Sequence, residues 1–178
     1  MNKNTYKTRV LAEGSVLIAL TVILKDIVPP IYRLPQGGSI TAASMVPLIL
    51  FALRRGLRWG VGEGVVYGLV HMYFDSSKPY NIVNPVQALL DYPIAFAALG
   101  IAGLFKKYPI VGVGVGIIGR FLAHFISGMI FFAIYAPSGM NPAIYVALYN
   151  GSYLSVELII SAVIIYILVK RRLLEIYL

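Results

Sequence analysis

The sequence predicts an all-α integral membrane protein, a compact bundle of six transmembrane helices that forms one domain over residues 1–178. Two observations lead to this fold class. Hydrophobic residues make up 59% of the chain and charged residues only 12%, about half the charged share of a soluble domain. The apolar residues also gather in long segments separated by short polar or basic stretches. This composition excludes a polar-surfaced soluble enzyme and a disordered chain.

Each predicted helix corresponds to one hydrophobic segment, and a segment needs roughly 20 mainly apolar residues to cross a bilayer. The second segment is short for a full span. Membrane strands would instead alternate in segments of about 10 residues. The first segment lacks a small-residue cleavage site after a short apolar core, so we expect it to be retained. The segments lie at about Val10–Val28, Ala42–Leu53, Leu57–Phe74, Val86–Phe105, Ile110–Tyr135 and Ala143–Val169.

The basic residues predict the orientation of the bundle. Eleven of the 15 Lys and Arg residues lie at the two termini and in two alternate connections, around Arg54–Arg58 and at Lys106-Lys107. The opposite connections hold three, and Arg120 lies inside a segment. By the positive-inside rule both termini are cytoplasmic, which requires an even number of spans. The formal charge of +8 therefore indicates orientation and contact with anionic lipid or partner subunits, not nucleic acid.

The sequence lacks the residues and motifs that disulfides, metal sites and ATP binding require. There is no cysteine, which excludes disulfides and thiolate metal sites. The two histidines are not at helical spacing, so no metal site is expected, and no cofactor is expected either. No GxxxxGK[ST] loop occurs, so energy for any transport must come from a partner.

The connections on the outer side are long and rich in turn formers. They lie at Pro29–Thr41, Asp75–Asn84 and Ala136–Asn141. We expect the first two to fold over a bound molecule as lids, and the alternative is that they are ordinary connectors.

Ionisable residues inside the spans are costly in a bilayer and are functional candidates. Asp91 lies about 9 Å, and His124 about 16 Å, from the outer ends of their helices by the rise per residue. Asp91 could pair with Arg120 or His124 in a structural ion pair, or it could face a bound cation. We interpret Glu63 and Arg120 as structural, with Glu63 capping polar groups near the inner loop.

Aromatic and amide side chains gather toward the outer half of the bundle. Asn150 has four hydrogen-bonding sites to satisfy. It lies about 140° around an ideal helix from Tyr145, so the two share a ligand only if it meets a wide arc or if Asn150-Gly151 distorts the helix. Some of the tyrosines could form only an interfacial belt.

Small residues on the first segment form a stripe at Gly14, Ser15 and Ala19. Such stripes allow close helix contact, either within one bundle or with another membrane subunit. For Ser15 and Ala19 we favour another subunit.

Five sequence strings resemble one family, the thiamine-specific substrate-binding (S) subunits of energy-coupling factor (ECF) transporters. The strings are LPQGGSIT, ALRRG, QALLDYPIAFAALGIAGLF, HFISGMIFF and YVALYNG. The resemblance implies a six-helix subunit in the cell membrane of a prokaryote that captures thiamine from outside with high affinity. It implies docking, through small residues such as Ser15 and Ala19, on a transmembrane coupling subunit and two ATPases. ATP would be used by those partners only.

The resemblance also implies roles for single residues. Asp91 matches the acidic position that faces the ligand, and Tyr92 follows it. Tyr145 and Asn150 match the pair that meets the aminopyrimidine. The remaining expected binding residues are His124, the stacking position Phe132, the aromatic position Tyr67 and the outer-loop tyrosine Tyr80. Two departures are the absence of a Trp in the first outer loop and an Asp where some members have Glu at position 91.

Two alternatives remain open from the sequence. A relative that captures another vitamin or precursor, such as a hydroxymethylpyrimidine or riboflavin, would share the fold but would not need Asp91 for a neutral substrate. A small intramembrane enzyme or a structural membrane protein would need other groups: an enzyme would place a base beside a nucleophile or a second carboxylate. Counted along their helices, Asp91 and His124 lie at different depths, which argues against an enzyme.

Overall fold

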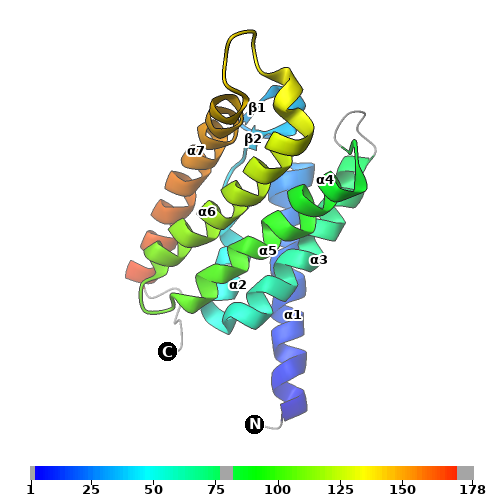
Figure 1. The fold of residues 1–178 in the computed structure, drawn as a ribbon. Coiled ribbons are helices and arrows are strands. Elements are labelled where there is room, and N and C mark those ends of the chain that lie inside the picture. The colour runs from blue at the N-terminus through cyan, green and yellow to red at the C-terminus, as the bar shows by residue number, and fades with distance from the viewer. Residues whose placement is uncertain (1–2, 77–81, 172–178) are drawn as a thin grey trace.

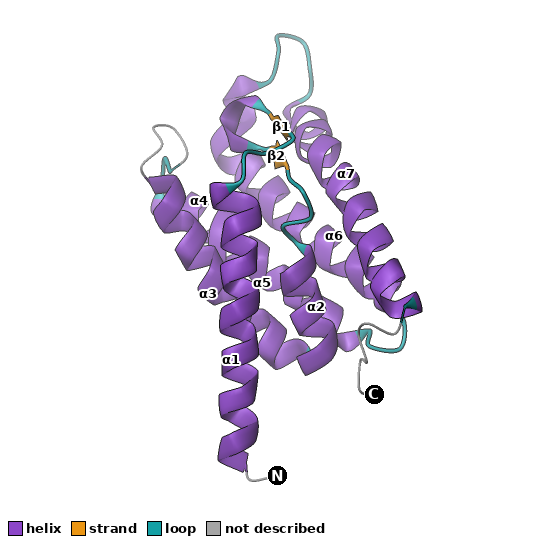
Figure 2. Ribbon diagram, turned by 180° about the vertical axis from the view of Figure 1, so that it is seen from behind, coloured by secondary structure: helices purple, strands orange, loops and turns teal. Residues whose placement is uncertain are grey.

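The computed structural model describes residues 3–76 and 82–171, which fold into six successive helical rods (Figures 1 and 2). The expected six-helix bundle is therefore confirmed, with boundaries that move by a few residues. The first three rods are α1 (Lys3–Val22, continued by a π-helical turn at Ile23–Ile27), α2 (Val46–Arg55) and α3 (Leu57–Ser76). The fourth rod begins with α4 (Pro85–Leu89) and continues through a π-helical turn (Leu90–Ile94), α5 (Ala95–Leu99) and a 3-10 segment (Gly100–Leu104). The last two rods are α6 (Pro109–Ser127, continued to Tyr135) and α7 (Pro142–Lys170).

Three of the described rods are long and apolar enough to cross a membrane by length and composition alone. They are Pro85–Leu104, Pro109–Tyr135 and Pro142–Lys170. α2 has 10 residues, about 15 Å of helix, which is half the thickness of a bilayer core. In the chain just before α2, Thr41, Ser44 and Met45 are buried, whereas Ala42 is exposed. Irregular backbone at membrane depth is tolerated where protein covers it, as it does here.

Two Asn-Pro pairs start rods on the side opposite the termini. The Asn84 side-chain oxygen accepts a hydrogen bond from the Val86 N–H at 2.8 Å, and Asn141 does the same for Ala143 at 2.8 Å. Each cap satisfies a backbone donor that the first turn leaves open, and the proline that follows has no N–H to satisfy. These local signals explain why the starts of α4 and α7 lie within one residue of the predicted positions.

The first outer connection forms a small hairpin. β1 (Tyr32–Arg33) pairs antiparallel with β2 (Ser39–Ile40), with Tyr32 opposite Ile40. The hairpin lies at the end of the bundle away from both termini (Figure 1). Lys25 precedes this connection and belongs to the π-helical turn that ends the first rod. The apolar run continues through Ile27, so the helix ends only before Pro29-Pro30.

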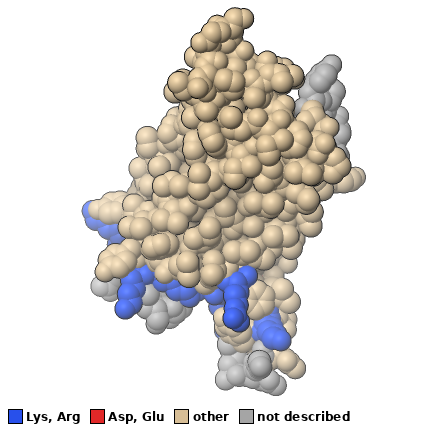
Figure 3. Space-filling model, viewed as in Figure 1, with Lys and Arg blue, Asp and Glu red and all other residues tan. Residues whose placement is uncertain are grey.

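Basic side chains gather at the other end. On the face shown in Figure 3, the Lys and Arg side chains lie only at the end where the chain begins and ends. Glu13 of α1 pairs there with Arg54, at 2.7 Å, and with Arg55. Glu63 does not cap polar groups as expected, because neither of its buried carboxylate oxygens has a hydrogen-bond partner within the described parts of the chain.

Close backbone contacts between α3 and α5 set the centre of the bundle. A Cβ added to Gly64 would lie 2.3 Å from the Phe96 carbonyl oxygen, and one added to Gly100 would lie 2.3 Å from the Val61 nitrogen. Only residues without a side chain permit this approach. It brings the outer half of α3 beside the π-helical turn at Leu90–Ile94, where Asp91 and Tyr92 lie.

Substitution of Gly64 by Ala is expected to lower the free energy of unfolding by about 1–3 kcal/mol, because the methyl group would overlap backbone atoms of α5. The measurement is denaturation by sodium dodecyl sulfate in detergent micelles. Gly62→Ala is the matched control, because no atom lies within 4 Å of a Cβ at that position. Equal stability of the two variants would contradict the packing described for α3 and α5.

Candidate substrate-binding site

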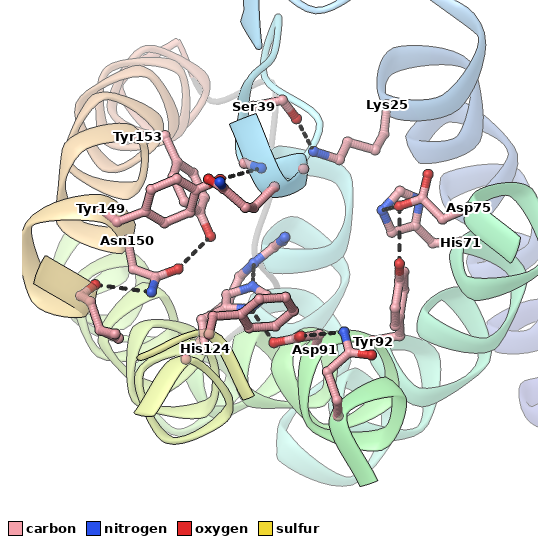
Figure 4. Close-up of a pocket in the computed structure, with 18 of the residues that line it drawn as sticks. Lys25, Ser39, His71, Asp75, Asp91, Tyr92, His124, Tyr149, Asn150 and Tyr153 are labelled. Atoms are coloured by element: carbon pink, nitrogen blue, oxygen red, sulfur yellow. Dashed lines mark hydrogen bonds and ion pairs between the residues drawn. The ribbon is translucent and has the colours of Figure 1, made fainter. Parts of the chain in front are cut away.

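A cavity lies beneath the hairpin at the end of the bundle away from the termini (Figure 4). Its volume is about 100 Å³, several times the 10–15 Å³ that one water molecule requires. Side chains of α1, α3, α4, α6 and α7 surround it and the hairpin tip covers it. The lining residues are Lys25, Gln36, Gly37, Gly38, Ser39, His71, Asp75, Gln87, Asp91, Tyr92, Arg120, His124, Gly128, Phe132, Tyr145, Val146, Tyr149, Asn150 and Tyr153.

Asp91 is held in the cavity wall by three donors. Its Oδ2 accepts from Gln87 Nε2 at 2.6 Å, one helical turn earlier, and from Ser127 Oγ at 2.9 Å. Its Oδ1 lies 2.9 Å from His124 Nδ1. Three donors hold the carboxylate in one orientation. The site therefore presents a fixed negative charge.

Arg120 holds His124 in place in this wall of the cavity. Its Nε donates to His124 Nε2 at 3.2 Å, and its guanidinium lies 4.0 Å from the centre of the Phe96 ring. Because guanidinium can only donate, His124 Nε2 accepts, and its proton lies on Nδ1, which donates to Asp91. Arg120, His124 and Asp91 thus form one hydrogen-bonded chain. Arg120 supports structure, as expected, and also lines the cavity.

The contact between His124 and Asp91 corrects the depth estimate made from the sequence. Counting residues inward from the helix ends assumed that all outer ends lie at one level. The two rods have outer ends within one residue of those predicted, at Tyr135 and Pro85, so it is the common level of these ends that does not hold. The two side chains therefore meet even though their counted depths differ.

α7 lines the cavity along a wide arc. Tyr145, Val146, Tyr149, Asn150 and Tyr153 all contribute, and they cover about 140° of an ideal helix. Asn150 Nδ2 donates to the Val146 carbonyl at 3.0 Å, and its Oδ1 accepts from Tyr153 at 3.1 Å. α7 runs unbroken through Asn150-Gly151. Of the two possibilities for Tyr145 and Asn150, the wide arc is therefore the one observed.

A second polar cluster lies on the opposite wall, where α1 meets α3. His71 Nδ1 bonds to Asp26 Oδ1, and its Nε2 lies 3.5 Å from Asp75 Oδ2. Tyr92 donates to Asp75 at 3.2 Å. Lys25 Nζ donates to Ser39 of the hairpin at 2.6 Å. The cavity is therefore polar on both sides, with ionisable groups held by defined partners.

Six of the eight binding residues expected from the sequence line this one cavity: Asp91, Tyr92, His124, Phe132, Tyr145 and Asn150. Tyr67 does not. It is fully buried in the core behind the lining, and its hydroxyl donates to Asp26 at 3.2 Å. Tyr67 therefore supports the second cluster instead of reaching the cavity. Tyr80 lies outside the described residues.

Several lining residues were not among those expected to bind substrate, including Lys25, His71, Asp75, Gln87 and Tyr153. A signal for some of them was present. Gln87 and Asp91 are four residues apart, as are His71 and Asp75, and Tyr145, Tyr149 and Tyr153 repeat at the same spacing. Residues four apart lie on one face of a helix. No such local signal exists for Lys25. Within the described chain, no group of three or more His, Asp or Glu residues could hold a metal ion.

The fold defines a multi-pass helical membrane protein with a polar cavity at one end of its bundle. Residues 11–176 match the family described as thiamine transporter protein (Thia_YuaJ), and the chain belongs to this family. It is 33% identical to the thiamine transporter ThiT of Bacillus subtilis over 94% of this chain and 93% of the relative. It is 27% identical to ThiT of Lacticaseibacillus paracasei over 86% of each.

A solved structure of ThiT from Listeria monocytogenes has the same fold. Its TM-score is 0.81, with 24% identity over 93% of this chain and 96% of that one. The resemblance to thiamine-specific S subunits that the sequence strings indicated is thereby confirmed. Membership of a transporter family also argues against the intramembrane enzyme considered above.

Substitution of Arg120 by Met is expected to lower the free energy of unfolding by about 3–5 kcal/mol. It removes one partner of a buried charged network and leaves the remaining groups uncompensated. Thermal unfolding in detergent measures the effect. The control is Arg58→Met, because Arg58 is exposed in the first turn of α3 and should change stability by less than about 0.5 kcal/mol. If both variants unfold alike, Arg120 does not organise the cavity wall.

Proposed function

We propose that this protein captures thiamine from outside the cell in the cavity beneath the hairpin and delivers it across the membrane with an ATP-driven energy-coupling module. The observation that carries this proposal is the fixed carboxylate of Asp91 in a cavity that also holds aromatic and amide groups. Thiamine has a permanently charged thiazolium ring, which needs a partner of opposite charge when water is removed. Its aminopyrimidine ring has donors and acceptors for polar side chains.

The balance of charge around the cavity supports a cationic ligand. Four carboxylates and two basic side chains interact there within the described part of the chain. With both histidines neutral, four negative charges less two positive charges leave an excess of two negative charges. A cation relieves this excess, whereas a neutral vitamin such as riboflavin does not. The four carboxylates are Asp26, Asp75, Asp91 and Glu157, and the two cations are Lys25 and Arg120.

The remaining lining residues suit the uncharged parts of thiamine. Tyr145 and Asn150 share the α7 wall, where an amide and a phenol can meet the aminopyrimidine. Phe132 stands at the cavity with its ring paired to Tyr135, at 6.3 Å between ring centres. An aromatic face beside a cation contributes about 0.5–2 kcal/mol. The hairpin supplies the lid, with backbone of Gly37 and Gly38 over the site.

Orientation follows from the basic end of the molecule. We infer that the end with Arg54, Arg55 and Lys106 faces the cytoplasm, by the positive-inside rule. The cavity then opens toward the outside, where substrate is captured. Delivery requires a change that exposes the cavity inward, and the chain has no ATP-binding loop of its own. A coupling subunit and two ATPases would supply that step.

Ser15 and Ala19 are proposed to contact the coupling subunit. Both are exposed on α1, beside the exposed apolar side chains of Leu11, Val16 and Leu20. Small side chains on an exposed apolar face permit close approach of another membrane helix. Gly14, the third member of the stripe, instead faces inward against Phe51. Within the stripe, Gly14 therefore faces the bundle, whereas Ser15 and Ala19 face outward.

Replacement of Asp91 by Asn is expected to weaken thiamine binding at least about 30-fold, the effect of losing about 2 kcal/mol from a buried charge pair. Binding is measured by isothermal titration calorimetry on purified protein. The pyrimidine half of thiamine is the control ligand, because it lacks the thiazolium charge and should lose much less affinity. Thiamine binding that is unchanged in the variant would remove the charge role, and absence of binding to the wild type would overturn the substrate.

Replacement of Ser15 by Leu is expected to abolish thiamine uptake by reconstituted vesicles that contain the coupling module and ATP. Its larger side chain would hold the coupling helix away from α1. Affinity of the isolated variant for thiamine should stay within about twofold, because Ser15 lies far from the cavity lining. Ser155→Leu on α7, also exposed, is the matched control. Normal uptake by the Ser15 variant would place the docking surface elsewhere.

A further inference from the structure

The hairpin that covers the cavity is fixed to α7 at two points, and the first is its root at Thr41. Glu157 Oε1 accepts from both the backbone N–H and the hydroxyl of Thr41, each at 2.6 Å. Ser44 adds a hydrogen bond to the same hydroxyl at 2.6 Å. Glu157 and Thr41 are both fully buried. Because separation would leave a buried carboxylate without donors, this root contact is costly to break.

The second point is the hairpin tip at Gly38. The Tyr149 hydroxyl accepts from the Gly38 N–H at 3.0 Å and donates to the Pro35 carbonyl. Both bonds involve neutral groups, and Tyr149 is only partly buried. Water can therefore replace them at modest cost when the tip moves away. Figure 4 shows Tyr149 reaching from α7 toward the hairpin, with Lys25 reaching Ser39 from the α1 side.

The tip between these contacts is built as a stiff unit. The β1–β2 pair and a hydrogen bond from the Leu34 N–H to the Gly38 carbonyl at 2.7 Å close it. Gln36 and Gly37 hold positive φ angles of 59° and 96°, conformations that the closed turn fixes. A stiff tip that moves does so as one body about its root. Because the root contact is more costly to break than the tip contact, the tip contact breaks first.

We propose that Tyr149 is a positioning residue that sets the rate at which the cavity exchanges substrate, while Glu157 holds the root of the lid as a pivot. The proposal rests on the proposed function, because it takes the hairpin as a lid over thiamine. The bonds of Tyr149 to the tip join protein atoms only, so they hold the lid with or without a substrate beneath it. They must open for entry and for exit alike.

This arrangement predicts a kinetic signature that a direct ligand contact would not produce. In Tyr149→Phe, the association and dissociation rate constants for thiamine should both rise about 5- to 30-fold, the factor expected for two neutral hydrogen bonds. The equilibrium affinity should change by less than about threefold, because the variant keeps the ring that lines the cavity and loses only a hydroxyl that is bonded to the hairpin. The rates are measured by rapid filtration with radiolabelled thiamine and by chase with unlabelled thiamine. The single tryptophan, Trp59, lies in the first turn of α3, far from the hairpin, so its fluorescence is a poor reporter.

Two further variants sharpen the test. Gly38→Ala keeps an ordinary backbone conformation, but its Cβ would lie 2.9 Å from the Tyr149 hydroxyl, so it should weaken the same contact from the other side and raise both rates. Tyr145→Phe is the control, because Tyr145 lines the cavity one turn earlier on α7 and is proposed to touch the substrate. It should raise dissociation alone and weaken affinity.

Hydrogen–deuterium exchange tests the lid without any ligand. In Tyr149→Phe, amides of residues 34–40 should exchange about 5- to 30-fold faster than in the wild type, while those of 41–46 should not change. Unchanged exchange at the tip, or a rise in dissociation alone, would overturn the role of Tyr149. Failure of the wild type to bind thiamine would overturn the proposed function and would leave the exchange result to decide the lid.

Discussion

The burial of ionised side chains inside an apolar bundle is the constraint on which this structure depends. An isolated charge in such surroundings is strongly unfavourable, so each one must be hydrogen-bonded or paired. Asp91 meets the requirement through Gln87, His124 and Ser127, and Arg120 reaches the same network through His124. These bonds fix α4 against α6 and orient the carboxylate toward the cavity. Structural support and the proposed charge recognition are therefore properties of one network.

Close packing between helices makes this network possible. Glycines on α3 and on the rod of α5 allow backbones to touch, which brings α3 beside the helix that carries Asp91. The π-helical turns at Leu90–Ile94 and Gly128–Phe132 both contribute to the cavity lining, and such turns are frequent at functional sites. The first contains Pro93, which cannot donate the hydrogen bond of a regular α-helix. Each π-helical turn contributes a residue that lines the cavity, Asp91 from the first turn and Phe132 from the second.

The lid joins parts of the chain that are far apart in sequence. Glu157 and Thr41 are separated by 116 residues, and Tyr149 and Gly38 by 111. The α1 side contributes Lys25 through Ser39. The hairpin thus connects the first and last rods across the mouth of the cavity. Because α1 also carries the exposed Ser15 and Ala19, one helix reaches from the proposed docking surface to the proposed lid.

The six rods, the basic end and six of the residues that line the cavity could be predicted from the sequence alone. The lengths of the rods follow from runs of apolar residues, and the starts of two rods follow from Asn-Pro caps. Asp91 is a candidate binding residue because an acid inside a span is costly. All three are local properties of the chain. The folded structure was needed to show that His124 contacts Asp91, that Tyr67 lies behind the lining, and that Lys25 and Glu157 hold the hairpin. Those contacts depend on how far each helix extends and how closely its neighbours approach. Such distances arise from packing between residues remote in sequence, and no local pattern encodes them.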